Sequence, residues 1–302
     1  MAEHPLKLIV VGSIGIDTVA TPYDRAENIL GGSASYACAA ASLFSPTGMV
    51  GVVGEDFPTE HEDLYRHFAI DLSGLQKKPG ETFRWSGVYR DNMDERDTLS
   101  TELNVFADFN PEIPPTYREA PFLFLANIHP ALQLLVLDQM QSSFVLLDTM
   151  DLWINTELEL LTQVIRRVDL LAVNESEAKQ LTGERFLPVA ARKLLDLGPD
   201  YVLIKKGEHG CMLFSNDRTI LLPAYPLASV IDPTGAGDAF AGGMIGALAS
   251  TDRVDTATLR EAMVAGSIVA SFAVEAFSLD RLQTLSRSEL NERIRLYRAM
   301  IG

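Results

Sequence analysis

Hydrophobic residues along this chain gather in short continuous runs, separated by longer stretches of mixed polarity. The runs cover residues 8–11, 49–53, 122–126, 144–147, 170–173 and 201–204. Runs of four or five aliphatic residues are typical of strands buried on both faces of a parallel sheet. Between and after them, helices are predicted at 130–140, 157–167, 259–277 and 286–300. This alternation of strands and helices predicts a three-layer α/β/α domain with a mainly parallel central sheet.

A different pattern occupies residues 80–106. Residues 82–89 alternate and are rich in aromatics, and residues 98–103 can return as a partner strand after the charged turn at 91–97. With residues 18–23 they predict a small antiparallel sheet, separate from the parallel core. Phe83 and Trp85 are two positions apart and therefore share one face. That face either forms the core of the small sheet or stacks on a ring of a bound molecule.

The most informative stretch is Asp-Pro-Thr-Gly-Ala-Gly-Asp-Ala-Phe at 232–240. A loop with two prolines precedes it, and small apolar residues typical of a buried helix follow it, so a helix is predicted to begin here. Gly235 and Gly237 let another molecule approach the backbone, and the free N–H groups of a helix N-terminus bind anions, phosphate above all. Asp238 is then either a helix cap or a general base beside an anion site.

Composition narrows the possible partners. The chain has 302 residues, of which 47% are hydrophobic and 22% charged, and its net charge is −16. So acidic a surface repels nucleic acid and anionic membranes, and we expect neither as a partner. Cys38 and Cys211 suit buried free thiols in a reducing compartment, and we expect a cytoplasmic protein. The histidines and cysteines show no metal-ligand spacing, and no Walker-type phosphate loop occurs.

The string at 232–240 resembles the C-terminal signature of the ribokinase-like (phosphofructokinase B) carbohydrate kinase family. Two further segments strengthen the resemblance: the Gly31-Gly32 pair that opens a small-residue helix, and Asn174 followed by Glu177. The resemblance implies one ribokinase-like domain over residues 1–302, with a β-sheet lid from about 17–28 and 80–106. It also implies transfer of the ATP γ-phosphoryl group to a hydroxyl, most simply the primary CH2OH of a sugar.

The resemblance also implies roles for the residues around the acceptor. Asp238 would be the general base, and the backbone N–H groups of Gly235, Ala236 and Gly237 would form the anion hole. Asp17, which follows the first strand, would bind sugar hydroxyls together with Gly31 and Gly32. The family has an asparagine four residues after the second glycine of this pair. Here Tyr36 stands at that place, so a bulky phenol replaces an amide in the acceptor pocket.

A second set of residues would bind the nucleotide, ATP, and its ions. Asn174 and Glu177 would lie near the phosphates, with Glu177 holding Mg2+ through water; the same pair also fits a helix N-cap and capping box. The remaining candidates lie in the strand end at 201–210 and in the loop at 232–234. They are Lys205, Gly207, Gly210, Thr234 and Asp232. Asp232 is either a site for a monovalent cation such as K+ or a simple turn acid.

Alternatives remain open at this point. The protein could be a nucleoside kinase of the same fold, with Tyr36, Phe83 or Trp85 receiving the base. It could also be a non-catalytic relative that binds nucleotide or sugar, although a pure binder has no use for a base at Asp238. Asp148 ends a strand at the edge where α/β enzymes bind ligands, either as an anchor or as a site residue. The family resemblance leaves open a homodimer formed through the lid.

Overall fold

A nine-stranded sheet forms the centre of the computed structural model, which describes residues 5–93 and 96–302. Its strand order is β13-β12-β11-β10-β9-β8-β1-β4-β5, and only β12 and β13, at one edge, run antiparallel to their neighbours. The mainly parallel sheet predicted from the sequence is therefore confirmed. The strands are β1 (Leu8–Val11), β4 (Thr47–Val53), β5 (Asp71–Lys77), β8 (Phe122–Leu125), β9 (Phe144–Asp148), β10 (Leu170–Asn174), β11 (Tyr201–Lys205), β12 (Cys211–Phe214) and β13 (Thr219–Leu222).

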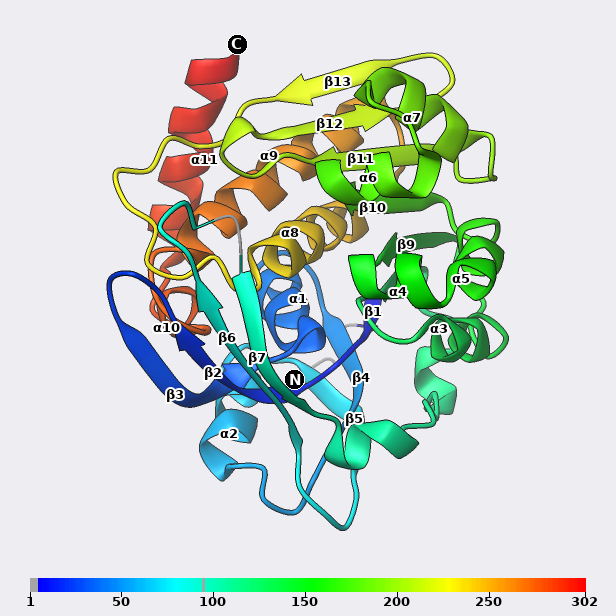
Figure 1. The fold of residues 1–302 in the computed structure, drawn as a ribbon. Coiled ribbons are helices and arrows are strands. Elements are labelled where there is room, and N and C mark those ends of the chain that lie inside the picture. The colour runs from blue at the N-terminus through cyan, green and yellow to red at the C-terminus, as the bar shows by residue number, and fades with distance from the viewer. Residues whose placement is uncertain (1–4, 94–95) are drawn as a thin grey trace.

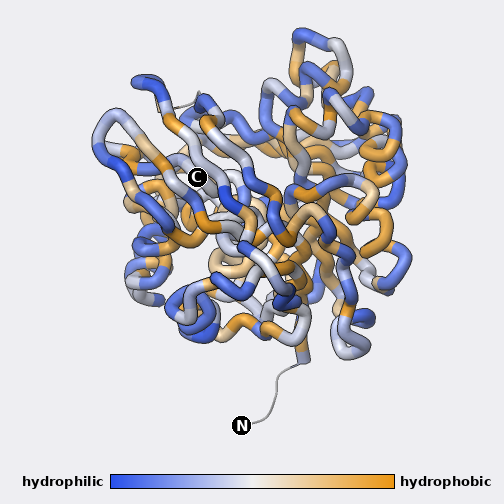
Figure 2. The backbone as a smooth tube through the Cα atoms, turned by 60° about the horizontal axis from the view of Figure 1, so that its bottom comes forward, coloured by the Kyte–Doolittle hydropathy of each residue, from blue (hydrophilic) through white to orange (hydrophobic). Residues whose placement is uncertain are grey.

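Helices cover both faces of this sheet and complete the three layers (Figure 1). Each face has its own core of buried aliphatic and aromatic side chains, and the hydropathy colouring places the apolar stretches inside and the polar ones on outer loops (Figure 2). The helices are α1 (Ser33–Ser42), α2 (Thr59–His67), α3 (Pro130–Leu137), α4 (Asp151–Thr156), α5 (Leu158–Ile165), α6 (Glu175–Thr182), α7 (Leu187–Leu195), α8 (Ala236–Thr251), α9 (Thr256–Ala273), α10 (Asp280–Gln283) and α11 (Arg287–Ile301), with short 3-10 turns at Asn104–Asp108, Pro115–Tyr117 and Gly207–His209.

A second sheet of four strands, in the order β3-β2-β6-β7, lies beside the N-terminal end of α8 (Figure 1). Its strands are β2 (Gly15–Ala20), β3 (Arg25–Gly31), β6 (Phe83–Tyr89) and β7 (Arg96–Glu102). The prediction that this sheet is antiparallel is wrong for one pair, because β2 and β6 run parallel. These two strands are separated in sequence by part of the large sheet, so no hairpin fixes their relative direction. Part of the predicted turn at 91–97 lies outside the described residues.

The sequence prediction missed some boundaries and some strands. The helix predicted at 259–277 ends earlier, since α9 stops at Ala273, and Ser278 then takes a positive φ of 54°. The strands β3, β5, β12 and β13 were not predicted individually. All four lie at or next to sheet edges. Polar residues interrupt the apolar ones in β3 and β5, so no continuous hydrophobic run marks these two strands. The strands β12 and β13 are short apolar runs of four and three residues that the prediction did not assign.

Close packing of α1 against α8 fixes where α8 begins. A Cβ atom on Gly242 or Gly246 would overlap the backbone of Ala37 or Ala41 in α1. The small residues that predicted a buried helix thus let the two backbones approach each other closely. As a result, the Gly-Gly turn before α1 and the Thr-Gly-Ala-Gly turn before α8 lie at the same end of the two helices.

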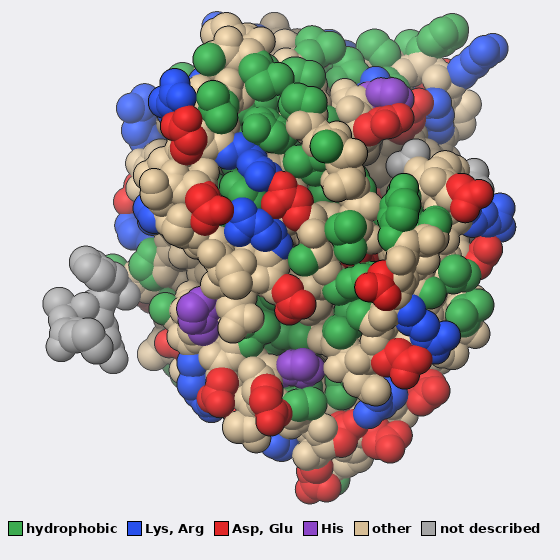
Figure 3. Space-filling view, turned by 90° about the vertical axis from the view of Figure 1, so that its left-hand side faces the viewer, with side chains coloured by type: hydrophobic (Ala, Val, Ile, Leu, Met, Phe, Trp, Pro, Cys, Tyr) green, Lys and Arg blue, Asp and Glu red, His purple; other side chains and the backbone are tan. Residues whose placement is uncertain are grey.

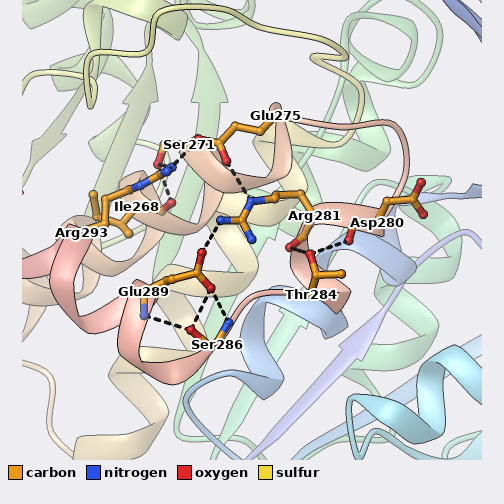
Figure 4. A network of polar contacts seen from close by, with 9 residues as sticks. All are labelled: Ile268, Ser271, Glu275, Asp280, Arg281, Thr284, Ser286, Glu289 and Arg293. Atoms are coloured by element: carbon orange, nitrogen blue, oxygen red, sulfur yellow. Dashed lines mark hydrogen bonds and ion pairs between the residues drawn. The ribbon is translucent and has the colours of Figure 1, made fainter.

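The C-terminal helix α11 is fastened to α9 and α10 by a polar network (Figure 4). Glu275 pairs with Arg281 at 3.0 Å and with Arg293 at 2.7 Å, and Arg281 also pairs with Glu289 at 2.9 Å. The Arg293 guanidinium lies 3.4 Å from the centre of the Phe272 ring. These contacts hold the segment after α9 against α10 and α11.

The surface carries charges of both signs. On the face shown in Figure 3, hydrophobic side chains are interspersed with acidic and basic ones.

Both cysteines, Cys38 and Cys211, are buried and free, as predicted. Within residues 5–93 and 96–302, no helix combines the length and the apolar character needed to cross a membrane.

Candidate active site

The start of α8 has the geometry that the sequence predicts. Gly235 is its N-cap with a positive φ of 73°, and α8 follows from Ala236. Asp232 shapes the preceding turn, because its Oδ1 accepts a hydrogen bond from the Thr234 N–H at 2.8 Å. The Ala236 N–H donates to the Pro233 carbonyl at 3.2 Å. Among the backbone bonds of the described residues, none uses the N–H groups of Gly235 or Gly237, and these two remain available to an anion.

Gly235 is required for two independent reasons. Its positive φ disfavours any side chain. In addition, a Cβ atom here would overlap the ring of Tyr36, which comes from α1. Tyr36 therefore lies directly against the turn that opens α8, and the two signature segments of the sequence meet at this contact.

Asp238 lies in the first turn of α8 and is partly buried. Burial is the main reason that its pKa is raised to about 7, and the negative charge of Asp148 raises it further. Lys205 and Arg96 act in the opposite direction. A carboxyl group with a pKa near neutrality suits a general base that takes a proton from an alcohol.

Asp17 lies on the neighbouring small sheet, in β2, and is 4% exposed. It is thus part of a strand of the small sheet, at the start of the segment 17–28 that is expected to contribute to the lid. A Cβ atom on Gly31 would overlap its carboxylate, so the first glycine of the Gly-Gly pair makes room for Asp17. Burial, followed by the charge of Asp232, raises the pKa of Asp17 to about 7. Gly32 caps α1 with a φ of 92°.

Three buried polar atoms in this region have no hydrogen-bond partner: Asp17 Oδ1, Tyr36 OH and Asp232 Oδ2. Burial, followed by the charges of Asp232 and Asp17, raises the pKa of Tyr36 well above its usual value. The three groups therefore belong to one electrostatic neighbourhood. Unpartnered buried polar groups are costly, and a cluster of them is typical of a site that a polar ligand or ion completes.

The small sheet reaches the start of α8. The Tyr89 hydroxyl of β6 and the Thr234 Oγ1 are 3.2 Å apart. Arg96, which is paired with Tyr89 in the β6–β7 register, lies 5.9 Å from the centre of the Trp85 ring. Trp85 is also paired with Asp17 in the β2–β6 register, so both side chains project from one face of the sheet. Phe83 instead packs against Phe106 of the 3-10 turn at Asn104–Asp108, with 5.5 Å between the two ring centres.

The nucleotide-side candidates lie across the ends of three adjacent strands, β9, β10 and β11. Asn174 is the N-cap of α6 and forms the predicted capping box with Glu177, with hydrogen bonds of 2.7 and 2.8 Å. Burial is the main cause that raises the pKa of Glu177 to about 7, and Lys205 opposes the rise. Lys205 binds both carboxylate oxygens of Asp148, at 2.9 and 2.8 Å. Asp148 is therefore a member of this cluster.

The two candidate glycines after β11 have different surroundings. Gly207 begins a 3-10 turn with a φ of 53°. A Cβ atom on Gly210, whose φ is 86°, would overlap the Leu222 carbonyl of β13. Gly210 thus serves the packing of β12 against the next loop, and its N–H donates to the Gly207 carbonyl at 3.1 Å.

A dedicated metal cage is absent from the described residues, since no group of three or more His, Cys, Asp or Glu side chains could hold an ion there. That arrangement fits Mg2+ bound mainly through substrate phosphates and water, for which one or two nearby carboxylates suffice. Glu177, 7% exposed, is such a carboxylate. The unpartnered Asp232 Oδ2 is likewise free to face a small cation.

Comparison with known proteins now identifies the family. Residues 6–283 match the pfkB family carbohydrate kinase pattern. The chain belongs to the pfkB carbohydrate kinase family. It is therefore a phosphotransferase, a kinase for sugars or nucleosides that acts on hydroxyl groups.

This pfkB-family kinase is similar in sequence to a nucleoside kinase and in fold to solved ribokinases. A cytidine kinase from Thermococcus kodakarensis is 31% identical over 247 residues, which cover 80% of this chain and 87% of the relative. Ribokinase from Giardia lamblia has the same fold, with a TM-score of 0.82 at 19% identity over 97% of this chain and all of the other. A putative ribokinase II from E. coli, solved with ATP and Mg2+, has a TM-score of 0.79 at 18% identity, over 96% and 99% of the two chains.

Sequence reasoning missed two members of the site, Tyr89 and Arg96. Tyr89 ends the predicted aromatic strand and Arg96 falls in the predicted charged turn, and neither position was assigned a role. Both reach the start of α8 only because the small sheet folds over it. Tyr89 lies 145 positions from Thr234 in the chain, so no local signal could have found the contact.

Proposed function

We propose that this kinase transfers the γ-phosphoryl group of ATP to a primary hydroxyl of a sugar, with Asp238 as the general base. One observation carries the proposal. The free N–H groups of Gly235 and Gly237, the Asp238 carboxyl with its raised pKa, and the cation of Lys205 converge at the start of one helix. Catalysis of phosphoryl transfer rests mainly on positioning the two substrates and on stabilising the negative charge of the transferred group.

The chain's own groups divide the work as follows. Asp17 accepts hydrogen bonds from acceptor hydroxyls, and the backbone at Gly31 and Gly32 shapes the wall beside it. Asp238 takes the proton of the attacking hydroxyl. The Gly235 and Gly237 N–H groups stabilise the negative charge that builds on the phosphoryl oxygens, whereas Ala236 contributes less because its N–H is already engaged.

The cofactor proposal is ATP with Mg2+. Asn174 and Glu177 present a capped helix N-terminus to the phosphates. Lys205 and the turn at Gly207 border the phosphates. Thr234 holds the loop before α8 through its hydrogen bonds with Asp232 and Tyr89. Mg2+, held by phosphate oxygens and by water on Glu177, would neutralise phosphate charge when bound. We propose Asp232 as a site for a monovalent cation such as K+, since one of its oxygens shapes the turn and the other has no partner.

A nucleoside is the second candidate acceptor. It is supported by the similarity to the cytidine kinase and by the register that sets Trp85 beside Asp17 on one face of the small sheet. An aromatic ring there could stack on a base. The small sheet would then act as a lid that excludes water, so that ATP is not hydrolysed without an acceptor. A cytoplasmic location and a homodimer through the lid remain predictions.

The test is ADP release from Mg-ATP over a panel of free pentoses, hexoses, ribonucleosides and inositols. We expect one class to stimulate release, and Asp238→Asn to reduce kcat for that acceptor by about 100-fold or more. If no acceptor stimulates release by the wild type, or if Asp238→Asn retains the wild-type rate, the proposal is wrong. Stimulation by nucleosides alone would select the second candidate.

A further inference from the structure

Asp148 and Lys205 form an ion pair that spans three strands of the large sheet. Asp148 ends β9 and Lys205 ends β11, with β10 between them. Two strand spacings separate their backbones by about 10 Å, a gap that a long lysine chain can cross. The ammonium binds both carboxylate oxygens, and the side chains are only 17% (Lys205) and 6% (Asp148) exposed. The pair is thus a built feature of the sheet edge and not a chance surface contact.

The ammonium ends beside the proposed anion hole. A Cβ atom on Gly237 would lie 3.2 Å from the Lys205 Nζ. Burial disfavours the charge of Lys205, but Asp148, Glu177 and Asp238 outweigh it and raise the pKa of the ammonium. A permanent positive charge therefore stands between the start of α8 and the start of α6, where the phosphates of ATP lie in the proposed function.

A lysine alone would not hold this position. Its four-carbon chain is flexible and its ammonium is a point charge without directional geometry. Glu177 and Asp238 offer competing negative charges on either side. Asp148 fixes the position of the ammonium, because both of its carboxylate oxygens bind it. The Asp148 carboxylate is itself oriented by a hydrogen bond from the Thr149 N–H at 3.1 Å.

We infer that Asp148 is a positioning residue, which acts on the reaction by holding the Lys205 ammonium beside the Gly237 backbone where it contacts the β- and γ-phosphates of the nucleotide. This inference rests on the proposed function, since it takes the nucleotide to be ATP. It has a specific consequence for nucleotide binding: Asp148 contributes to that binding only through Lys205. Removing Asp148 should therefore weaken ATP binding when Lys205 is present and should have no further effect when Lys205 has been removed.

The experiment is a double-mutant cycle on nucleotide binding, measured by titration calorimetry without acceptor. Mg-ATP and AMP are titrated into the wild type, Asp148→Asn, Lys205→Met and the double variant. The matched control is Asp138→Asn, which breaks an exposed ion pair with Arg167 at 2.8 Å. Thermal melting of each variant checks that it is folded; if Lys205→Met is not, Lys205→Gln takes its place.

We expect Lys205→Met to weaken Mg-ATP binding about 10- to 100-fold, the range of a hydrogen bond to a charged group. Asp148→Asn should weaken it by a smaller factor, and the double variant should match Lys205→Met. AMP binding should stay unchanged in all of them, because AMP lacks the β- and γ-phosphates, and Asp138→Asn should behave as the wild type.

Two results would overturn the inference. If Asp148→Asn weakens Mg-ATP binding as much in the Lys205→Met background as in the wild type, Asp148 acts independently, for instance on Mg2+. If it weakens AMP binding equally, the substitution has only disturbed the site. The proposed function fails separately: in that case the wild type itself binds no Mg-ATP, or no acceptor stimulates ADP release.

Discussion

Replacing Asp238 with asparagine should inactivate the kinase and at the same time stabilise the ligand-free fold at neutral pH. Burial raises the pKa of this carboxyl from 3.8 to about 7. Between these two values the folded protein keeps a proton that the unfolded chain has lost. The free energy of unfolding therefore declines as the pH rises from about 4 to 7 and stays at the lower level above that. An asparagine has the same shape but never ionises, so the variant avoids this loss.

The size of the effect follows from the pKa shift. Each unit corresponds to 1.36 kcal/mol, so a rise from 3.8 to about 7 sets an upper value of about 4 kcal/mol. Water reaches the partly exposed carboxylate and lowers this value. We expect Asp238→Asn to unfold with a free energy about 2 kcal/mol above the wild type at pH 8. At pH 5 the difference should be about 0.8 kcal/mol, because roughly 40% of the wild-type loss between pH 4 and 7 has occurred by then.

The assay is urea unfolding of the ligand-free protein at pH 5 and pH 8, alongside the pH dependence of kcat/KM for the best acceptor. Wild-type kcat/KM should fall on the acid side with an apparent pKa near 7, because a protonated Asp238 cannot act as a base. The control is Asp252→Asn at the other end of α8, an exposed carboxylate that pairs with Lys7. A variant that is no more stable than the wild type at pH 8 would refute the reasoning about buried charge.

Three further outcomes are expected. Gly235→Ala should lower the free energy of unfolding, measured with urea, by about 2–4 kcal/mol and abolish turnover. The control is Gly183→Ala, which has a similar φ but open space around it and should lower the same free energy by only about 1 kcal/mol. Equal costs would rule out the clash with Tyr36. Glu177→Gln keeps the capping box and removes a buried carboxyl with a raised pKa, so its melting temperature at neutral pH should not fall. The Mg2+ concentration for half-maximal rate should rise several-fold, and an unaltered Mg2+ requirement would exclude Glu177 from the ion site. Tyr36→Phe removes an unpartnered hydroxyl, so stability should not fall, while KM for the acceptor rises about fivefold; an unchanged KM would show that this hydroxyl does not bind the acceptor.

The large sheet was predictable because each of its central strands is buried on both faces and reads as a continuous apolar run. The strands β1 and β9 begin where the hydrophobic runs predict. The small sheet was harder to predict, because β7 is exposed along its whole length and β3 mixes polar and apolar residues. Its parallel β2–β6 pair depends on a contact between segments that are far apart in the chain.

The sequence by itself determined the local geometry of the site. Positive φ at Gly235, the helix start at Ala236, the carboxylate of Asp238 in the first turn and the capping box of Asn174 and Glu177 follow from nearest-neighbour chemistry. These features need only a few consecutive residues, so they can be read from the chain.

Only the tertiary structure decided which groups face one another. The contact of Tyr36 with Gly235, the approach of Tyr89 and Arg96 from the small sheet, and the pairing of Asp148 with Lys205 across β10 all join distant segments. The raised pKa of Asp238 is also a tertiary property, because it comes first from burial and then from the charge of Asp148. Sequence specifies which carboxylates are available, and packing sets how much water and which charges surround each of them.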